Sequence, residues 1–419
     1  MFKAVAGYYK DNERLRLLVK IIAVWLISRA VMLLMVPVMN LIADEPHQWL
    51  YYMNPWDAEW YKGIVENGYQ PPKSSGMASW AFFPLYPLVC MAVRLVTMGS
   101  IDTYAVGMTV SNICIIIAVY YAVKYADIEL DMKKYNKKTV EDIIIFLMLA
   151  GPFAVYYGAM YTEALFILCV ILCFYNSARH NYMAAGIAAA MASATRIVGC
   201  MLVFVLITYM FMETCAECRA KHNSEMKDNK EAGIIDKCML TEEAGILIAG
   251  NISLASVIRT FIKNVIKEPK KLVAIMISPL GIFIYMNYLR YFCGDSWAFY
   301  HVQRAWRTQK MFPVIGVLFK SCTGQLSAAS GVKTLNGIIL GWLCVITLML
   351  YAAMIRKKHY ALGIFGIIVL LIPLTSSVMS TLRFIMGSFV IYIGVAEIIA
   401  GCNLSLIHIS EPTRLRRIS

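Results

Sequence analysis

The stretch "LLVKIIAVWLISRAVMLLMVPVMNL", residues 17–41, decides the fold of this chain. It is long enough to cross a bilayer, which takes about 20 residues of helix. It is too long for a signal peptide and lacks a small-residue cleavage site, so we expect it to be retained as a transmembrane helix. Further apolar runs follow it, and lipid offers no partner to unpaired backbone groups. The sequence therefore predicts an all-α polytopic membrane protein.

The composition agrees with this fold class. The chain is 60% hydrophobic with a mean hydropathy of +0.63, and its 16% charged residues fall well below the roughly 25% of a soluble domain. The net charge of +13 does not indicate a nucleic-acid partner. Most Lys and Arg residues lie in loops, where they act as orientation signals and contact lipid headgroups.

The distribution of basic residues predicts the topology. The N-terminus is expected to be cytoplasmic because it carries Lys3, Lys10, Arg14, Arg16 and Lys20. The first helix then places residues 43–80, which are rich in carboxylates, on the external face. Two crossings by segments 81–99 and 103–123 would put the lysine-rich loop 124–140 outside. We therefore expect segment 81–99, with Pro84, Pro87 and Arg94, to lie along the outer surface.

The rest of the chain alternates regularly. The predicted helices lie at 142–158, 161–177, 183–213 (two short helices meeting near Arg196), 271–292, 335–354, 360–379 and 384–402. About ten spans result, since each needs about 20 residues or a pair of shorter helices. Residues 1–403 are expected to form one domain, with external loops 43–102 and 293–333 and a cytoplasmic loop 214–270. A weakly amphipathic part of that last loop, 244–262, is expected on the membrane.

The final residues break the pattern. "LSLIHISEPTR", 404–414, resembles the in-frame translation of a sequencing adapter, so we expect residues 404–419 not to be native. The alternative is a basic cytoplasmic tail.

The first external loop contains the residues most suited to chemistry. In "NPWDAEWYKGIVENGYQPP", 54–72, Asp57 and Glu59 stand between Trp56 and Trp60. An aromatic belt at the interface with incidental acids would explain the pattern. A general base that takes the proton of an attacking sugar hydroxyl would explain it equally well, because aromatic faces suit sugar rings.

Four further ionisable residues are predicted near the same face: Glu163, Arg196, Asp295 and Arg383. Glu163 begins an apolar span, where it is either functional or complements the helix dipole. Arg196 and Arg383 either bind phosphate or extend to headgroups. The external face is poor in other cations, which favours phosphate.

The cysteines give little evidence for a metal site. Cys215, Cys218 and His222 form C-x2-C-x3-H, but no second pair follows at zinc-site spacing. We expect a solvated loop rather than zinc there, and no metal or other cofactor.

Six motifs in order resemble the PIG-V family of mannosyltransferases: "PWDAEWYKGIVENGY", "AFFPLYPL", "YTEALF", "ATRIVG", "GDSWAFYHVQRAW" and "STLRF". They extend over residues 54–390. The resemblance implies the GT-C glycosyltransferase fold, with surface-lying helices and a catalytic acid in the first external loop. It also implies a lipid-phosphate sugar donor, such as polyprenyl-phosphate mannose, and inversion at the anomeric carbon.

Under this resemblance Asp57 matches the catalytic acid of the family. The substrate-binding candidates are Trp56, Glu59, Tyr61, Tyr161, Glu163, Arg196, Asp295 and Arg383. Glu59-Trp60 departs from the family pattern, which often has a smaller or His-containing stretch there. The implied partners are the donor, a glycan or glycolipid acceptor and membrane lipids, in a bacterial cell membrane.

Two rival functions remain open. A GT-C enzyme that transfers another sugar fits the same motifs. A transporter or flippase of a polar lipid would instead place ionisable residues near the midplane and show paired broken helices or repeats. Here the polar residues gather toward one face and the sequence has no repeat.

Overall fold

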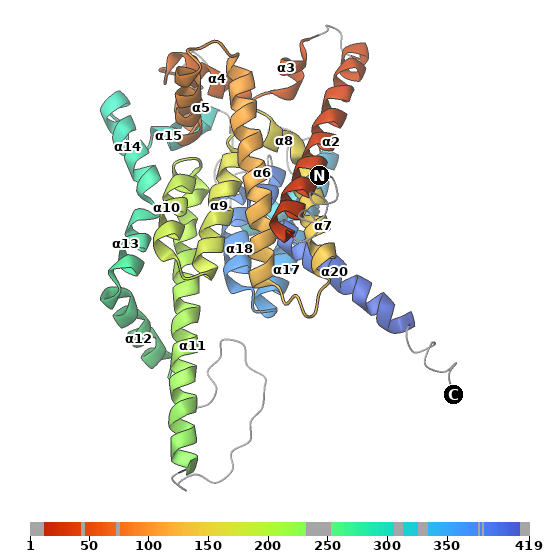
Figure 1. Cartoon of the computed structure of the whole chain (residues 1–419). Coiled ribbons are helices and arrows are strands. Elements are labelled where there is room, and N and C mark those ends of the chain that lie inside the picture. Colours follow the sequence, from red (N-terminus) through yellow and green to blue (C-terminus); the bar gives the residue numbers. More distant parts are fainter. Residues whose placement is uncertain are drawn as a thin grey trace.

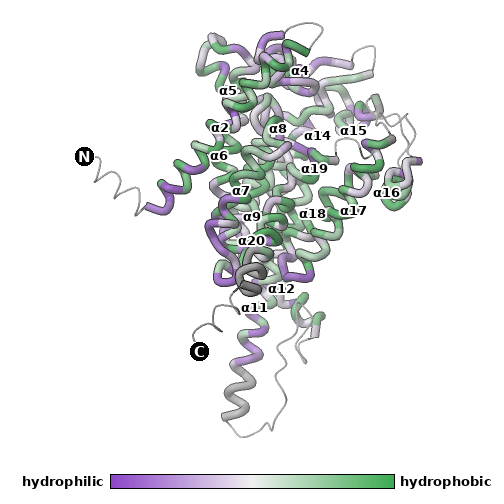
Figure 2. The backbone as a smooth tube through the Cα atoms, turned by 90° about the vertical axis from the view of Figure 1, so that its right-hand side faces the viewer, coloured by the Kyte–Doolittle hydropathy of each residue, from purple (hydrophilic) through white to green (hydrophobic). Residues whose placement is uncertain are grey.

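The computed structural model describes residues 12–42, 47–72, 76–231, 253–305, 313–325, 334–375, 378 and 381–410. Every secondary-structure element in these ranges is a helix, which confirms the all-α class. Most of the helices run side by side in one bundle (Figure 1). Hydrophobic residues dominate the bundle, and hydrophilic segments gather toward its two ends (Figure 2).

The described helices support a polytopic membrane protein. Four are long and apolar enough to cross a membrane, or up to six if each of two bent helix pairs counts as one span. The four are α2 (Glu13–Ile42), α6 (Thr103–Glu129), η2 (Ile197–Met201) with the first part of α11 (Leu202–Glu231), and α17 (Thr334–Arg356). Shorter apolar helices also occur: α5 (Leu85–Val96), α9 (Glu163–Ala178), α10 (Tyr182–Ser193) and α18 (Tyr360–Leu374). The count of ten spans stays a prediction.

Helix α9 lies in the core of the bundle. Most of its side chains are buried, and it packs against α6 and α10. Small residues let neighbouring helices approach closely, as is common in membrane bundles. At Gly281, for example, an added Cβ would lie 2.3 Å from the carbonyl oxygen of Ala190 in α10.

Three predicted spans are broken rather than straight. Segment 142–158 falls in α7 (Lys137–Leu149) and α8 (Ala154–Gly158), which are separated by residues 150–153. Segment 271–292 forms α13 (Pro269–Ile277) and α14 (Leu280–Cys293), bent by 42°. Pro279 lies at this break and has no N–H for a helical hydrogen bond. Segment 384–402 belongs to α19 (Thr381–Gly387) and α20 (Val390–Ser410), which meet at 69°. The predicted single helices are therefore wrong at these three places.

The predicted cytoplasmic loop also differs from the structure. Helix α11 continues through the charged stretch to Glu231 instead of ending near 213, and it projects from the bundle (Figure 1). Its last part, "KHNSEMKDNKE", has no Gly or Pro to stop a helix. Residues 244–252 of the predicted amphipathic part lie outside the described residues. The rest falls in α12 (Leu254–Lys267), which packs against α11.

The first predicted external loop is mostly helical. It contains α3 (Trp49–Met53), α4 (Ala58–Asn67), η1 (Ser79–Ala81) and α5, gathered at one end of the bundle (Figure 1). Helix α5 packs against α4 and α6 and leaves Leu88, Leu95 and Val96 exposed. The surface position expected for 81–99 stays a prediction. The second predicted external loop contains α15 (Ala298–His301), η3 (Val302–Ala305) and α16 (Val314–Cys322).

A buried charge cluster ties the opposite end of the bundle together. His359 precedes α18, and its Nδ1 lies 2.8 Å from Glu129 Oε1 at the end of α6. Its Nε2 lies 3.6 Å from Glu397 Oε1 in α20, to which the Tyr135 hydroxyl also donates at 2.8 Å. Burial alone would lower the pKa of His359, but the two carboxylates outweigh burial and raise that pKa to about 9.

We expect this cluster to make stability depend on pH. The pKa of His359 in the folded chain exceeds the ordinary value of about 6.5. The stabilisation is therefore complete below about pH 6.5 and is lost as the pH rises through about 9. Thermal unfolding of the detergent-solubilised chain should occur at lower temperature above pH 9 than below pH 6.5. His359→Gln should flatten this dependence, and an identical pH profile in both proteins would contradict the assignment.

Candidate active site

The turn before α4 positions Asp57. Asn54 is buried, and its Oδ1 accepts a hydrogen bond of 2.7 Å from the backbone N–H of Met160. The Tyr161 hydroxyl donates to the carbonyl oxygen of Pro55 and accepts from the N–H of Asp57 at 3.2 Å. The turn is thus tied to the segment just before α9. Trp56 has a φ of +51°, a left-handed conformation that is unusual for a bulky residue and that the surrounding contacts maintain.

Arg383 joins two carboxylates that are far apart in the sequence. Its Nη1 lies 2.5 Å from Asp57 Oδ2, and its Nε lies 2.6 Å from Glu163 Oε1. The side chain belongs to the short helix α19, next to the bend before α20. Arg383 therefore connects the first loop, the start of α9 and the C-terminal helix pair.

Glu163 is the most buried charge of the site. It has no exposed surface, and Arg196 Nη1 lies 2.9 Å from the same Oε1 atom that Arg383 contacts. Arg196 lies just after α10, where the chain turns into η2. A buried carboxylate costs several kcal/mol unless cations and hydrogen bonds compensate it, and here two guanidinium groups do so. Glu163 Oε2 is buried as well and has no hydrogen-bond partner.

The charges of these four residues balance. Asp57 and Glu163 carry two negative charges at neutral pH, and Arg196 and Arg383 carry two positive ones. We refer to these four side chains as the ion-pair cluster. In this structure neither arginine is free, so a phosphate that binds there has to replace or join an existing carboxylate partner.

Aromatic rings flank both arginines. The Arg383 guanidinium carbon lies 5.2 Å from the centre of the Tyr161 ring and 5.7 Å from that of Tyr156. The Arg196 guanidinium lies 5.4 Å from the Phe384 ring. Such contacts stabilise a cation shielded from water. Tyr156 was not among the predicted residues, although the run "FAVYYGAMY" before α9 is an aromatic signal that pointed to it.

The remaining candidates of the first loop lie around the cluster. The Trp56 side chain is 74% exposed and stacks on Tyr156, with 6.4 Å between the ring centroids. Tyr61 is buried, and its hydroxyl lies 3.3 Å from Thr162 Oγ1, next to Glu163. Glu59 is exposed in the first turn of α4 and accepts a hydrogen bond from the Tyr104 hydroxyl. Asp57 and Glu59 thus have different partners.

Asp295 lies apart from the ion-pair cluster. Its Oδ2 is 2.7 Å from His301 Nδ1, and its Oδ1 accepts from the N–H of Trp297 at 2.8 Å. These contacts close the turn before α15, and the hydrogen bond from His301 lowers the pKa of Asp295. Among the described residues, no hydrogen bond or ion pair links Asp295 to Asp57, Glu163 or Arg383.

Cys215, Cys218 and His222 lie along helix α11 rather than in the predicted loop. Within the described ranges, no three His, Cys, Asp or Glu side chains lie close enough together to hold a metal ion.

Comparison with known proteins identifies the family. The sequence model of the family of PIG-V mannosyltransferases matches residues 13–231. This range contains Asp57, Glu163 and Arg196. No curated protein and no solved structure is detectably similar to the chain. The matched range covers more than half of the sequence, so the chain belongs to the PIG-V family of mannosyltransferases and is a glycosyltransferase.

Proposed function

We propose that this enzyme transfers a mannose from a polyprenyl-phosphate donor to a lipid-linked or cell-envelope glycan, with inversion at the anomeric carbon. The site would face the exterior of a bacterial cell membrane, with the N-terminus in the cytoplasm. The observation that carries the proposal is the contact between Asp57 and Arg383. It brings a carboxylate and a phosphate-binding type of side chain together beside exposed aromatic rings.

In the proposed mechanism, the donor phosphate replaces Asp57 on Arg383. A phosphate offers the same kind of anionic oxygens as a carboxylate, and the planar guanidinium binds either in a fork geometry. The exchange would leave Glu163 held by Arg196, so the buried carboxylate would keep a cation at 2.9 Å. It would also free the Asp57 carboxylate to accept a hydrogen bond from the acceptor hydroxyl.

The transfer step would then be a single displacement. The acceptor hydroxyl oxygen forms a bond with the anomeric carbon, while the bond between that carbon and the phosphate oxygen breaks. The phosphate leaves with the electron pair as a stable anion, so no second acid is needed. Asp57 takes the hydroxyl proton. Trp56 and Tyr156 present ring faces on which a sugar can stack.

The first test concerns the base. Asp57→Asn keeps the shape of the side chain but cannot accept a proton, and it should lower transfer by about 10²–10⁴. Glu59→Gln is the matched control, because Glu59 lies two residues further on and contacts Tyr104 instead of Arg383. It should retain most of the transfer activity measured with labelled polyprenyl-phosphate mannose.

Donor binding separates a catalytic role from a structural one. Asp57→Asn should bind the donor no less tightly than the original enzyme, because the carboxylate no longer competes for Arg383. If Asp57→Asn transfers normally and Glu59→Gln is inactive, the wrong carboxylate has been assigned. Normal transfer by both variants would exclude this loop from catalysis.

The second test concerns Arg383. Arg383→Lys keeps a positive charge near Glu163 but loses the fork that reaches two acceptors. A hydrogen bond to a charged group contributes roughly 1.5–3 kcal/mol, so the donor KM should rise about ten-fold or more. The same change at Arg196, which lies beside Glu163 and has no ion pair with Asp57 among the described residues, should raise the KM less. An unchanged KM with a lower melting temperature would make Arg383 purely structural.

The third test concerns orientation. Cysteines placed at the exposed positions Ser100 and Lys133 lie near opposite ends of α6. In a cysteine-free background in intact cells, an impermeant maleimide should label Ser100→Cys and not Lys133→Cys. The reverse labelling would overturn the proposed topology.

A further inference from the structure

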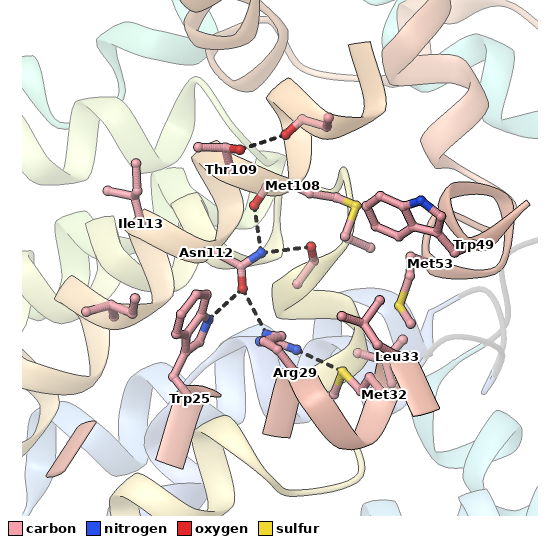
Figure 3. A pocket seen from close by; sticks show the side chains of 15 residues that line it. Trp25, Arg29, Met32, Leu33, Trp49, Met53, Met108, Thr109, Asn112 and Ile113 are labelled. Carbon is pink, nitrogen blue, oxygen red and sulfur yellow. Dashed lines mark hydrogen bonds between the residues drawn. The ribbon is translucent and has the colours of Figure 1, made fainter. Parts of the chain in front are cut away.

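A second candidate site lies between α2 and α6, and none of its lining residues belongs to the ion-pair cluster. A cavity of about 390 Å³ opens there, and its walls also include α3 and the segment around Gly158 (Figure 3). Most of its lining is apolar and contains Met32, Leu33, Met53, Met108 and Ile113. Leu33 and Ile113 are about half exposed, at 48% and 55%, although both belong to helices that can span a membrane. The cavity therefore opens toward lipid.

One charged side chain, Arg29, lines this cavity. Its Nε donates to Asn112 Oδ1 at 2.8 Å, and Asn112 also accepts from the Trp25 indole N–H (Figure 3). Its Nη1 donates to the carbonyl oxygen of Ala154 at 3.0 Å and to the Met32 sulfur at 2.9 Å. Its Nη2 is buried and has no acceptor. None of the described carboxylates lies within ion-pair distance of Arg29.

The charge of Arg29 is therefore not balanced as the charges of the ion-pair cluster are. An arginine inside a membrane span is costly and normally pairs with an anion or lines a pathway. A thioether is a weak acceptor on a flexible side chain, so Met32 can give way to a stronger one. Gly158 lies against the end of the Arg29 side chain, since a Cβ there would lie 2.7 Å from Arg29 Nη1.

We propose that this groove binds an anionic glycerophospholipid of the surrounding membrane. Its phosphate would take the place of Met32 on Arg29, and one acyl chain would lie along the apolar wall between α2 and α6. Trp49 at the rim, 45% exposed, belongs to the class of side chains that gather at the headgroup level. The bound lipid would pack against α3, four residues before Asp57, and so support the loop that carries the base.

The contacts of Arg29 favour a membrane lipid over the sugar donor as the ligand of this groove. The hydrogen bonds of Arg29 go to Asn112, Ala154 and Met32 and not to Arg383 or its partners, whereas the reacting phosphate in the proposed mechanism has to bind Arg383. A net negative headgroup is favoured over a zwitterionic one because no other described charge compensates the guanidinium.

Photocrosslinking of the full chain tests the proposal. A photoreactive amino acid replaces Ile113 in the groove or, as a control on α2, Ile27, which is 65% exposed and does not line the cavity. The protein is placed in nanodiscs of phosphatidylcholine with a minor share of phosphatidylglycerol, and the captured lipid is identified by mass spectrometry. The groove probe should enrich phosphatidylglycerol about ten-fold over its share, since a charge-assisted hydrogen bond contributes roughly 1.5–3 kcal/mol. The control probe should capture lipids in the proportions of the bilayer.

Variants identify the headgroup contact. Arg29→Gln should abolish the enrichment while capture of lipid chains continues, and Arg29→Lys should retain part of it. The lysine variant keeps the test open if the glutamine variant does not fold. Enrichment that is equal at both probe positions, or that survives Arg29→Gln, would overturn the proposal. Preferential capture of added polyprenyl phosphate would also overturn it, since the groove would then hold the donor.

Discussion

The arrangement of the site depends on one buried charge, Glu163. A carboxylate with no exposed surface has to be compensated inside the bundle, and the chain supplies two arginines from distant segments. Arg196 comes from the turn after α10, and Arg383 comes from α19. Because both side chains converge on one oxygen, the start of α9, the α10–η2 turn and the C-terminal helix pair are fixed relative to one another. Arg383 also holds Asp57, through its Nη1 atom.

Breaks in the helices make this convergence possible. Arg196 lies where α10 ends and the chain turns into η2, and Arg383 lies in a short helix before a bend of 69°. A continuous helix would carry these side chains along its own surface, with their backbone amides already paired. A break places a long side chain at a helix end, from which it can reach across to a neighbour. The candidate residue Asp57 likewise lies in a turn, just before α4 begins at Ala58.

The sequence alone predicts an all-helical membrane protein and all four residues of the ion-pair cluster, but not the contacts between them. Hydropathy predicts helices, and the arginines and Glu163 stand out because charge is rare in apolar runs. The sequence does not predict that α13 and α14 are separate helices, because a proline bends some helices and ends others. The sequence also does not predict that Asp57 and Glu59 have different partners, because the direction of each side chain depends on the residue at which α4 begins. Asp295 was grouped with the site because it shares a predicted face, yet its partner His301 is local.

The balance of charge in the cluster has a consequence for how the reaction would be controlled. Under the proposed mechanism, Asp57 and the donor phosphate compete for Arg383, so each weakens the binding of the other by the same free energy. The Asp57 carboxylate would thus stay bound to Arg383 until the donor arrives. An acceptor hydroxyl or a water molecule in the empty site would meet a carboxylate that already holds a cation at 2.5 Å. One guanidinium would thus link substrate binding to base activation without any movement of the helices that carry it.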